Sequence, residues 1–185
     1  MAQRYIRYTI FILALIILDQ GSKWFLIERF FKTPDIAIGF AEWLTTLGQD
    51  RLSFMRHEIT SFFNLVMVWN QGVSFGMFSD SHDLMPLILS IFAIILSTIF
   101  AVWLTRSTRM TTSLPICLVI AGALSNVWDR ARFGAVADLF DVYIGTYHWP
   151  AFNIADSFIV VGVILLAIDT IFFEPKQKNG DNHGA

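Results

Sequence analysis

The stretch from Leu84 to Leu104 reads LMPLILSIFAIILSTIFAVWL and contains no charged residue. Its 21 residues are about the length that an α-helix needs to cross the ~30 Å hydrocarbon core of a bilayer. A surface helix of a soluble protein carries a polar stripe, which this stretch lacks. Pro86 lies near the start, where the first helical turn tolerates proline. The stretch therefore predicts a membrane-spanning helix.

Three further apolar segments lie before and after this stretch. They are shorter or are interrupted by polar residues, and they run over 8–27, 113–128 and 157–173. Arg4 and Arg7 before the first segment also resemble the start of a secretory signal peptide, but no small-residue cleavage site follows. The expected fold is a membrane all-α bundle of four transmembrane helices, built by residues 1–173 as a single domain. Its spans are expected at about 7–27, 84–104, 113–129 and 156–173.

The composition is typical of a membrane protein. Of the 185 residues, 55% are hydrophobic and 15% are charged, whereas soluble domains are about one quarter charged. The formal net charge of −2 gives no reason to expect a nucleic-acid partner. Cys117 is the single cysteine, so it cannot form an internal disulfide, and we expect it to be a small buried hydrophobe.

Basic residues predict the orientation in the membrane. The N-terminus and the 105–112 connection both contain arginine and no acidic residue. Short basic segments remain in the cytoplasm, so we expect both termini there, with a disordered tail at 174–185. The outer side then receives two long segments, 28–83 and 130–155. These segments hold most of the remaining polar residues, so function is expected near the outer face.

The first outer segment contains two predicted local structures. Residues 61–78 read SFFNLVMVWNQGVSFGMF, and this mixture of β-forming residues with Asn and Gly predicts one or two short strands. Pro34-Asp35 predicts a helix start, after which five apolar residues share one face: Ile36, Phe40, Trp43, Leu44 and Leu47. This pattern favours an amphipathic helix in the membrane interface, able to act as a mobile lid, over a small soluble cap helix.

Polar residues gather at the ends of the predicted spans. Ionisable groups that border a membrane are costly and are functional hypotheses by default. Asp19 and Lys23 are four residues apart, so they share a helix face and can neutralise each other. Asn126 and Arg130 have the same spacing at the outer end of the third span, with Asp129 beside them.

Three acidic residues follow along the chain. Asp138 and Asp141 lie in an apolar stretch, and Asn153 with Asp156 opens the fourth span. Asn-x-x-Asp before an apolar run is also typical of a helix N-cap with an acid in the first turn, which is the structural alternative. Two carboxyl groups that face each other at ~3 Å share one proton, and such a pair can activate water without a metal. The histidines are isolated and no His-Glu-x-x-His motif occurs, so we expect neither a zinc peptidase nor a cofactor.

Four sequence elements together resemble the lipoprotein signal peptidase family. They are Asp19-Gln20 with Lys23, VWNQGVSFG at 68–76, AGALSNVWDR at 121–130 with GAVADLFD at 134–141, and WPAFNIADS at 149–157. The resemblance covers roughly 8–173, with the elements in the family's order. Ser125 and Ala137 stand where the family more often has Gly and Val, and the 28–60 segment is longer than usual.

The resemblance implies an intramembrane aspartic endopeptidase of the bacterial inner membrane. Such an enzyme removes the signal peptide from diacylglyceryl-modified prolipoproteins, cuts just before the lipidated cysteine and binds globomycin-type inhibitors. The implied fold adds a small outer β-cradle and an interfacial helix to the four spans. The implied catalytic residues are Asp138 and Asp156, and the implied substrate-binding residues are Asn70, Gly72, Asn126, Arg130 and Asn153. Structural polar support is then assigned to Asp19, Lys23, Asp129 and Asp141.

A small membrane transporter or proton-relay subunit that uses the same acids is the alternative function. The lack of inverted repeats and of broken spans in matching halves argues against it. A non-catalytic scaffold, for which the two motif aspartates would be dispensable, is a third hypothesis. Cleavage of a lipid-modified precursor by the purified protein would separate all three.

Overall fold

A computed structural model describes residues 2–48, 50–72 and 84–173 of the chain. Two predicted features lie outside these residues: the end of the 61–78 strand region and the tail at 174–185.

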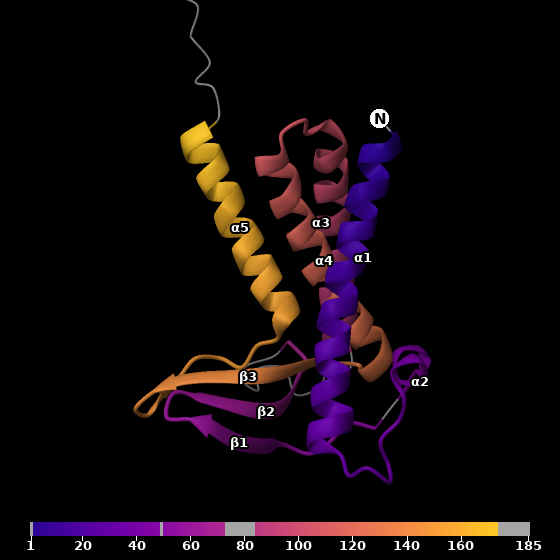
Figure 1. Ribbon diagram of the computed structural model, residues 1–185, viewed down its shortest axis with the longest axis vertical. Coiled ribbons are helices and arrows are strands. Elements are labelled where there is room, and N and C mark those ends of the chain that lie inside the picture. Colours follow the sequence, from indigo (N-terminus) through magenta and orange to yellow (C-terminus); the bar gives the residue numbers. More distant parts are fainter. Residues whose placement is uncertain (1, 49, 73–83, 174–185) are drawn as a thin grey trace, which may run out of the picture.

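Four long helices stand side by side and form the bundle (Figure 1). They are α1 (Ala2–Trp24) with its π-helical continuation η1 (Phe25–Phe31), α3 (Met85–Arg106), α4 (Met110–Phe133) and α5 (Ile154–Phe173). Each is long and apolar enough to cross a membrane, which confirms the four predicted spans. The N-terminus and the last turn of α5 lie at the same end of the bundle (Figure 1).

Helix α4 is the central helix and contacts α1, α3 and α5. In its most apolar window 56% of the residues are buried inside the protein, against 11% for α3. The polar residues of α4 are therefore covered by protein, while α3 presents most of its surface to lipid. This packing explains why the sequence of α4 looks less apolar than that of a lipid-facing span.

The spans extend a few residues beyond their predicted limits. Helix α4 ends at Gly134, whose backbone is left-handed with φ = +64° and whose N–H bonds to the Arg130 carbonyl at 2.9 Å. Glycine adopts this conformation without strain, so it is a common helix terminator. The predicted end at 129 was too early because the Asp129–Phe133 turn is charged but helical.

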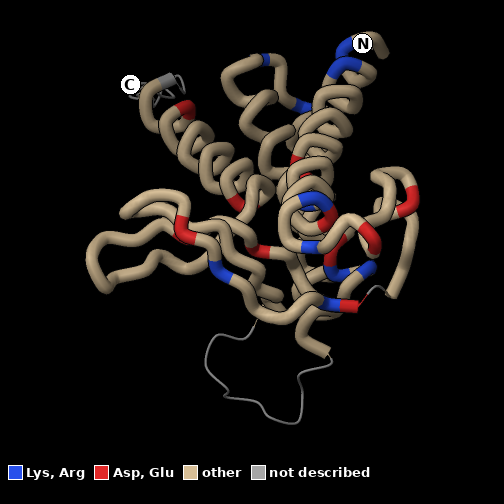
Figure 2. Tube along the Cα trace, turned by 60° about the horizontal axis from the view of Figure 1, so that its bottom comes forward, with Lys and Arg blue, Asp and Glu red and all other residues tan. Residues whose placement is uncertain are grey.

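A four-stranded antiparallel sheet lies across the other end of the bundle (Figure 1). Its strands are β1 (Met55–Thr60), β2 (Phe63–Asn70), β3 (Val136–Ile144) and β4 (Tyr147–His148), and they pair in that order. Strand β2 confirms the prediction within 61–78, but β1 begins earlier and β3 was not predicted. Figure 2 shows acids and bases gathered where the helices meet this outer layer, and long uncharged stretches along the helices.

The segment predicted to form an interfacial helix contains a helix, which is shorter than expected. Helix α2 (Phe40–Thr45) begins after Gly39, so the predicted start at Pro34-Asp35 is wrong. The preceding residues form turns, in which the Ile38 N–H donates to Glu28 Oε2 at 3.0 Å. Trp43 is 0% exposed and packs against Phe133, with ring centroids 5.9 Å apart.

This burial also changes the interpretation of the five-residue apolar face. Ile36 and Leu47 lie outside α2, and Trp43 points into the protein. Replacement of Trp43 should therefore lower thermal stability, because its side chain is fully buried. Trp43 belongs to the hydrophobic core under the sheet, with Ile27, Met67, Phe133, Ala137 and Leu139.

Candidate active site

The site lies where the ends of α4 and α5 nearest the sheet meet strands β2 and β3. Strand β3 carries Asp138, and the start of α5 carries Asn153 and Asp156. The last turns of α4 carry Asn126 and Arg130. The end of β2 adds Asn70 and Gly72, so the structure brings together all seven residues predicted as catalytic or substrate-binding.

Asn153 and Asp156 form a reciprocal cap at the start of α5. The Asp156 N–H donates to Asn153 Oδ1 at 3.0 Å, and the Asn153 N–H donates to Asp156 Oδ2 at 3.1 Å. This capping box confirms the structural alternative for the Asn-x-x-Asp spacing. The cap leaves the Asn153 amide nitrogen free to make contacts outside α5.

Asp138 receives two amide hydrogen bonds. Asn153 Nδ2 donates to its Oδ1 at 2.8 Å, and Asn70 Nδ2 donates to its Oδ2 at 3.0 Å. Asn70 faces Val136 in the β2–β3 register, so it reaches Asp138 diagonally on the same sheet face. Its own amide oxygen accepts the Gly72 N–H at 2.7 Å, in a turn where Gly72 has φ = +90°.

The carboxyl group of Asp138 is only 1% exposed. Burial raises its pKa to about 7, and the negative charge of Asp156 contributes in the same direction. The amide hydrogen bonds from Asn70 and Asn153 oppose this rise. Asp138 can therefore hold a proton up to near neutral pH.

Asn126 completes a network that joins the two aspartates. Its Nδ2 donates to Asp156 Oδ1 at 2.8 Å, and its Oδ1 accepts from Asn153 Nδ2 at 3.3 Å. Asn153 therefore donates to both Asp138 and Asn126. The side-chain amides of Asn70, Asn126 and Asn153 thus donate hydrogen bonds to the two carboxyl groups and fix their orientation.

Arg130 lies one turn beyond Asn126 on α4. Its Nη1 makes a long contact of 3.5 Å to the Asn126 carbonyl, while its buried Nε has no hydrogen-bond partner among the described residues. A buried guanidinium N–H without a partner is costly, so a bound acceptor would complete this group.

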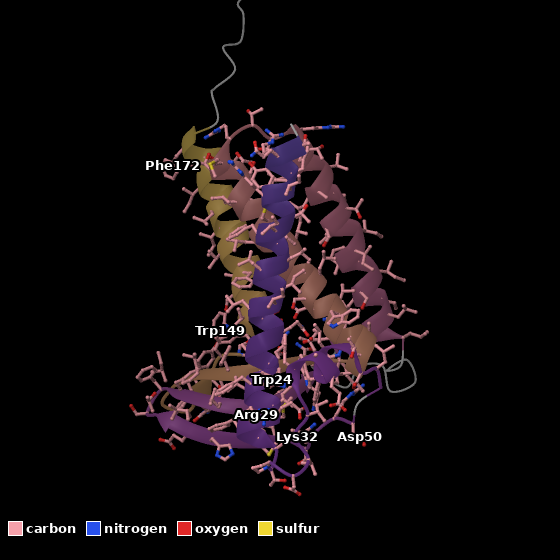
Figure 3. The ribbon with its side chains drawn as sticks, turned by 45° about the vertical axis from the view of Figure 1, so that its right-hand side comes forward. Trp24, Arg29, Lys32, Asp50, Trp149 and Phe172 are labelled. Carbon is pink, nitrogen blue, oxygen red and sulfur yellow. The ribbon has the colours of Figure 1, made fainter. Side chains whose placement is uncertain are left out.

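Two apolar hollows open beside the network. One, of about 240 Å³, is lined by α3, α4 and α5 and reaches Asn126 and Arg130. The other, of about 380 Å³, reaches Asp156 and Ser157 and is walled by Trp149, Pro150 and Phe152. Figure 3 shows Trp149 close to the end of α5 nearest the sheet. An apolar chain can therefore reach the network from the bundle or from the sheet side.

Three of the four residues predicted as polar support form a second buried cluster. Lys23 Nζ lies 2.7 Å from Asp19 Oδ2 and 2.7 Å from Asp129 Oδ2, and all three side chains are fully buried. The predicted pairing of Asp19 with Lys23 is therefore present, and Asp129 is its third member.

Asp141 has a separate role further along β3. It accepts from Asn64 Nδ2 at 2.7 Å and contacts His148 Nδ1 at 2.9 Å. Burial alone would raise its pKa, but the hydrogen bonds from Asn64 and His148 and the charges of His148 and Arg56 bring the pKa below its usual value. These contacts tie β2, β3 and β4 together, away from the amide network.

Sequence reasoning missed Asn64, Glu28 and Arg132. Asn64 is a lone amide inside the apolar run of β2, which is a signal that could have been used. Glu28 is buried and binds Lys32 at 2.7 Å. Arg132 is 1% exposed, and its Nη1 donates to Gln20 Oε1 at 3.2 Å and its Nη2 to the Trp43 carbonyl. No local pattern distinguished Arg132 from an arginine at a membrane surface.

Comparison with known proteins gives a family match. The model of the Peptidase_A8 family, described as signal peptidase (SPase) II, matches residues 11–172. The lipoprotein signal peptidase of Alteromonas mediterranea is 34% identical over 160 residues, which cover 85% of this chain and 87% of that protein. The lipoprotein signal peptidase of Syntrophus aciditrophicus is 34% identical over 167 residues, which cover 89% of each chain.

The fold is similar to that of a solved structure, which is described as a bacterial membrane enzyme determined by the in meso method at 2.3 Å resolution. The TM-score is 0.66 at 24% sequence identity, and the match covers 94% of this chain and 92% of that chain. This likeness concerns the fold: four long helices with an antiparallel sheet at one end.

Proposed function

Because the chain belongs to the signal peptidase II family, we propose that Asp138 and Asp156 are its catalytic pair. The chain has lipoprotein signal peptidase activity: it is an aspartic peptidase that removes signal peptides from prolipoproteins. The family match therefore favours this activity over the alternative of a transporter or proton-relay subunit. The observation that supports the residue assignment is the amide network, which holds two carboxyl groups from different elements in one partly buried site.

The two aspartates take different roles in this proposal. Asp138 is buried, and its raised pKa keeps it protonated near neutral pH, so it can donate a hydrogen bond to the scissile carbonyl oxygen. Asp156 lines an open hollow and acts as the carboxylate that accepts a proton from the attacking water. Asn126 and Asn153 keep the Asp156 oxygens in place while the water is deprotonated.

The reaction breaks one peptide bond and consumes one water. The water oxygen adds to the carbonyl carbon as Asp156 takes its proton and Asp138 gives a proton to the carbonyl oxygen. The tetrahedral intermediate then collapses: one of its hydroxyl groups returns a proton to Asp138 as the C–N bond breaks, and the proton on Asp156 passes to the leaving nitrogen. The products are the carboxyl end of the signal peptide and a free α-amine. Following the family resemblance, we place the cut just before the diacylglyceryl-modified cysteine.

Arg130 is proposed to bind the substrate. Its unpartnered Nε can donate to a peptide or ester carbonyl, and its planar fork can hold such an acceptor in a fixed direction. Asn70 and Gly72 are proposed to border the substrate on the sheet side. Gly72 has φ = +90°, so a residue with a Cβ would be strained in this turn.

The two apolar hollows fit a lipid-modified substrate. The hollow between α3, α4 and α5 can take an apolar signal-peptide segment and deliver its carbonyl groups to Arg130. The hollow beside Trp149 and Phe152 can take an acyl chain next to Asp156. A globomycin-type inhibitor, expected from the family resemblance, would compete for the same space.

The chain is a multi-pass membrane protein with bacterial relatives. We further propose that residues 1–173 are one domain of the bacterial inner membrane, with both termini in the cytoplasm and the site near the outer face. The basic residues near the N-terminus and between α3 and α4 support this orientation.

The pair is tested by Asp138→Asn and Asp156→Asn in purified protein, with cleavage of a diacylglyceryl-modified prolipoprotein as the measurement. Each variant should lower kcat at least about 100-fold, because an amide cannot exchange the catalytic proton. The matched control is Asp141→Asn, the same substitution on the same strand outside the network, which should keep kcat. Chelation with EDTA should leave activity unchanged. Near wild-type turnover in either catalytic variant would refute the assignment.

A further inference from the structure

A buried charged cluster joins α1 to α4 beneath the catalytic network. Lys23 bridges the carboxylates of Asp19 and Asp129 at 2.7 Å each. Gln20 Nε2 donates to Asp129 Oδ1 at 2.8 Å, and the Ser125 hydroxyl donates to Asp19 Oδ2 at 2.5 Å. Buried ion pairs are often no more stabilising than apolar residues of the same volume. Stability alone is therefore a weak reason for this cluster.

Asp19 holds the start of the helix that carries Asp156. Its Oδ1 accepts the N–H of Ala155 at 2.8 Å, across 136 residues of sequence. Ala155 immediately precedes Asp156, and its N–H is one of the first-turn donors that α5 cannot satisfy itself. The next N–H, that of Asp156, donates to Asn153 Oδ1. The N–H groups of Ala155 and Asp156 therefore both have a hydrogen-bond acceptor.

Asp129 makes the equivalent contact to the strand that carries Asp138. Its Oδ2 accepts the N–H of Ala137 at 3.3 Å, a longer and weaker hydrogen bond. Ala137 immediately precedes Asp138 on β3. Each carboxylate of the cluster therefore holds the peptide N–H one residue before a catalytic aspartate.

We propose that Asp19, Lys23 and Asp129 form a positioning unit that sets the separation of Asp138 and Asp156. Lys23 joins the two carboxylates through one nitrogen atom, so α5 and β3 are fixed to a common point on α1. An ammonium group can donate to both carboxylates at once, which an apolar residue of the same size cannot do. The inference rests on the proposed catalytic pair and gives the buried cluster a role in its geometry.

The test compares Asp19→Ala with Asp19→Asn in the cleavage assay. Alanine removes the acceptor of the Ala155 N–H, so Asp156 should shift, and kcat at the pH optimum should fall about 100-fold with little change in KM. Asparagine removes the same charge but keeps an amide oxygen for that N–H. The Asp19→Asn variant should therefore recover at least about tenfold of the kcat lost in Asp19→Ala.

Asp169→Ala is the matched control for a purely structural effect. Asp169 is a buried acid that joins α4 to α5 at the opposite end, by hydrogen bonds from Thr112 Oγ1 at 2.6 Å and Arg109 Nη2 at 2.8 Å. Its removal should lower the thermal midpoint but leave kcat unchanged. Equal losses of kcat in Asp169→Ala and Asp19→Ala would overturn the proposal, and so would an Asp19→Asn variant as slow as Asp19→Ala.

If Asp19→Ala does not fold, Asp19→Asn is sufficient for the test. Positioning by the Ala155 hydrogen bond predicts a kcat within about tenfold of wild type in that variant. A loss as large as that of Asp156→Asn would overturn the inference. Turnover by Asp138→Asn or Asp156→Asn would instead refute the catalytic pair itself, so the two failures are distinguishable.

Discussion

Asp138 and Asp156 belong to one network but have different surroundings. Asp138 is enclosed between β2, β3 and the start of α5, and both of its oxygens accept amide hydrogen bonds. Asp156 borders a hollow that a substrate can enter. The enclosed carboxyl group is therefore suited to hold the shared proton, and the accessible one to meet the water. Their chemistry is set by burial and by each other's charge, since both are ordinary carboxyl groups.

The raised pKa of Asp138 predicts how stability depends on pH. Its pKa is about 7 in the folded protein, above the usual value of 3.8, so between these values the folded state binds more protons than the unfolded state. Stability contributed by the neutral carboxyl is therefore lost as pH rises toward 7. Asp138→Asn has no such group, so the difference in Tm, variant minus wild type, should become more positive between pH 5 and pH 8 by at least about 5 °C.

Scanning calorimetry of both proteins in the same detergent measures this difference. Asp35→Asn is the control, since a hydrogen bond from Thr33 holds the pKa of Asp35 below its usual value, so its Tm difference should not rise over this range. A pH-independent Tm difference for Asp138→Asn would show that Asp138 is already ionised at pH 5.

At the residue scale the sequence identified polar residues that lie together in the structure, but it identified few of the contacts between them. The motifs identified Asp138, Asn153 and Asp156, and the Asn-x-x-Asp spacing predicted the α5 cap. The contacts of Asp19 with Ala155 and of Asn64 with Asp141 join residues 136 and 77 positions apart. Such pairs depend on how α1 packs on α5 and on the strand register, and no local spacing encodes either.

At the scale of elements, the close approach of α4 and α5 depends on Gly122. A Cβ built on Gly122 would lie 2.3 Å from the Ala155 carbonyl oxygen and 2.8 Å from Ile159 Cγ1. The first contact is to backbone, which cannot rotate away as a side chain can. Gly122 therefore lets the start of α5, which carries the proposed catalytic Asp156, lie directly on α4.

Gly122→Ala should displace the start of α5 and separate Asp156 from Asn126. We expect kcat to fall about 10–100-fold, with a loss of stability of about 1–3 kcal/mol. Gly21→Ala on α1 is the control, because nothing lies within 4 Å of the Cβ built there. That variant should keep its kcat and gain stability, since alanine favours the helix. Unchanged cleavage by Gly122→Ala would mean that the two helices can move apart without disturbing the pair.

Two elements differ from their sequence-based predictions for physical reasons. Strand β3 was not predicted because its residues up to Leu139 are buried on both faces, so polar and apolar residues do not alternate. Helix α2 begins six residues after Pro34, because Glu28 binds the Ile38 N–H and holds the intervening chain in turns. A buried acid on η1 thus overrides a local helix-start signal.

At the scale of the whole molecule, the sheet and the four helices divide the chain into two layers. The helical layer buries Tyr8, Leu104, Ile116 and Leu166 between its spans, while the outer layer has its own core around Trp43 and Met67. Trp24, Arg29 and Lys32 lie near the junction (Figure 3). Tryptophan and basic residues are enriched at membrane interfaces, so the junction fits a membrane boundary, with the proposed catalytic pair near it.

The proposed orientation can be tested with single cysteines at the two ends of the bundle. The native Cys117 is 0% exposed, so it should not react with a membrane-impermeant maleimide. Ser61→Cys lies in the exposed turn between β1 and β2, and Thr108→Cys lies in the exposed connection between α3 and α4. The cells are treated so that the outer envelope admits the reagent while the cytoplasmic membrane stays closed. The reagent should then label Ser61→Cys and leave Thr108→Cys unlabelled until the cytoplasmic membrane is lysed. Because four spans put both termini on the side of Thr108, labelling of Thr108→Cys before lysis would place the termini outside and the catalytic pair at the cytoplasmic face.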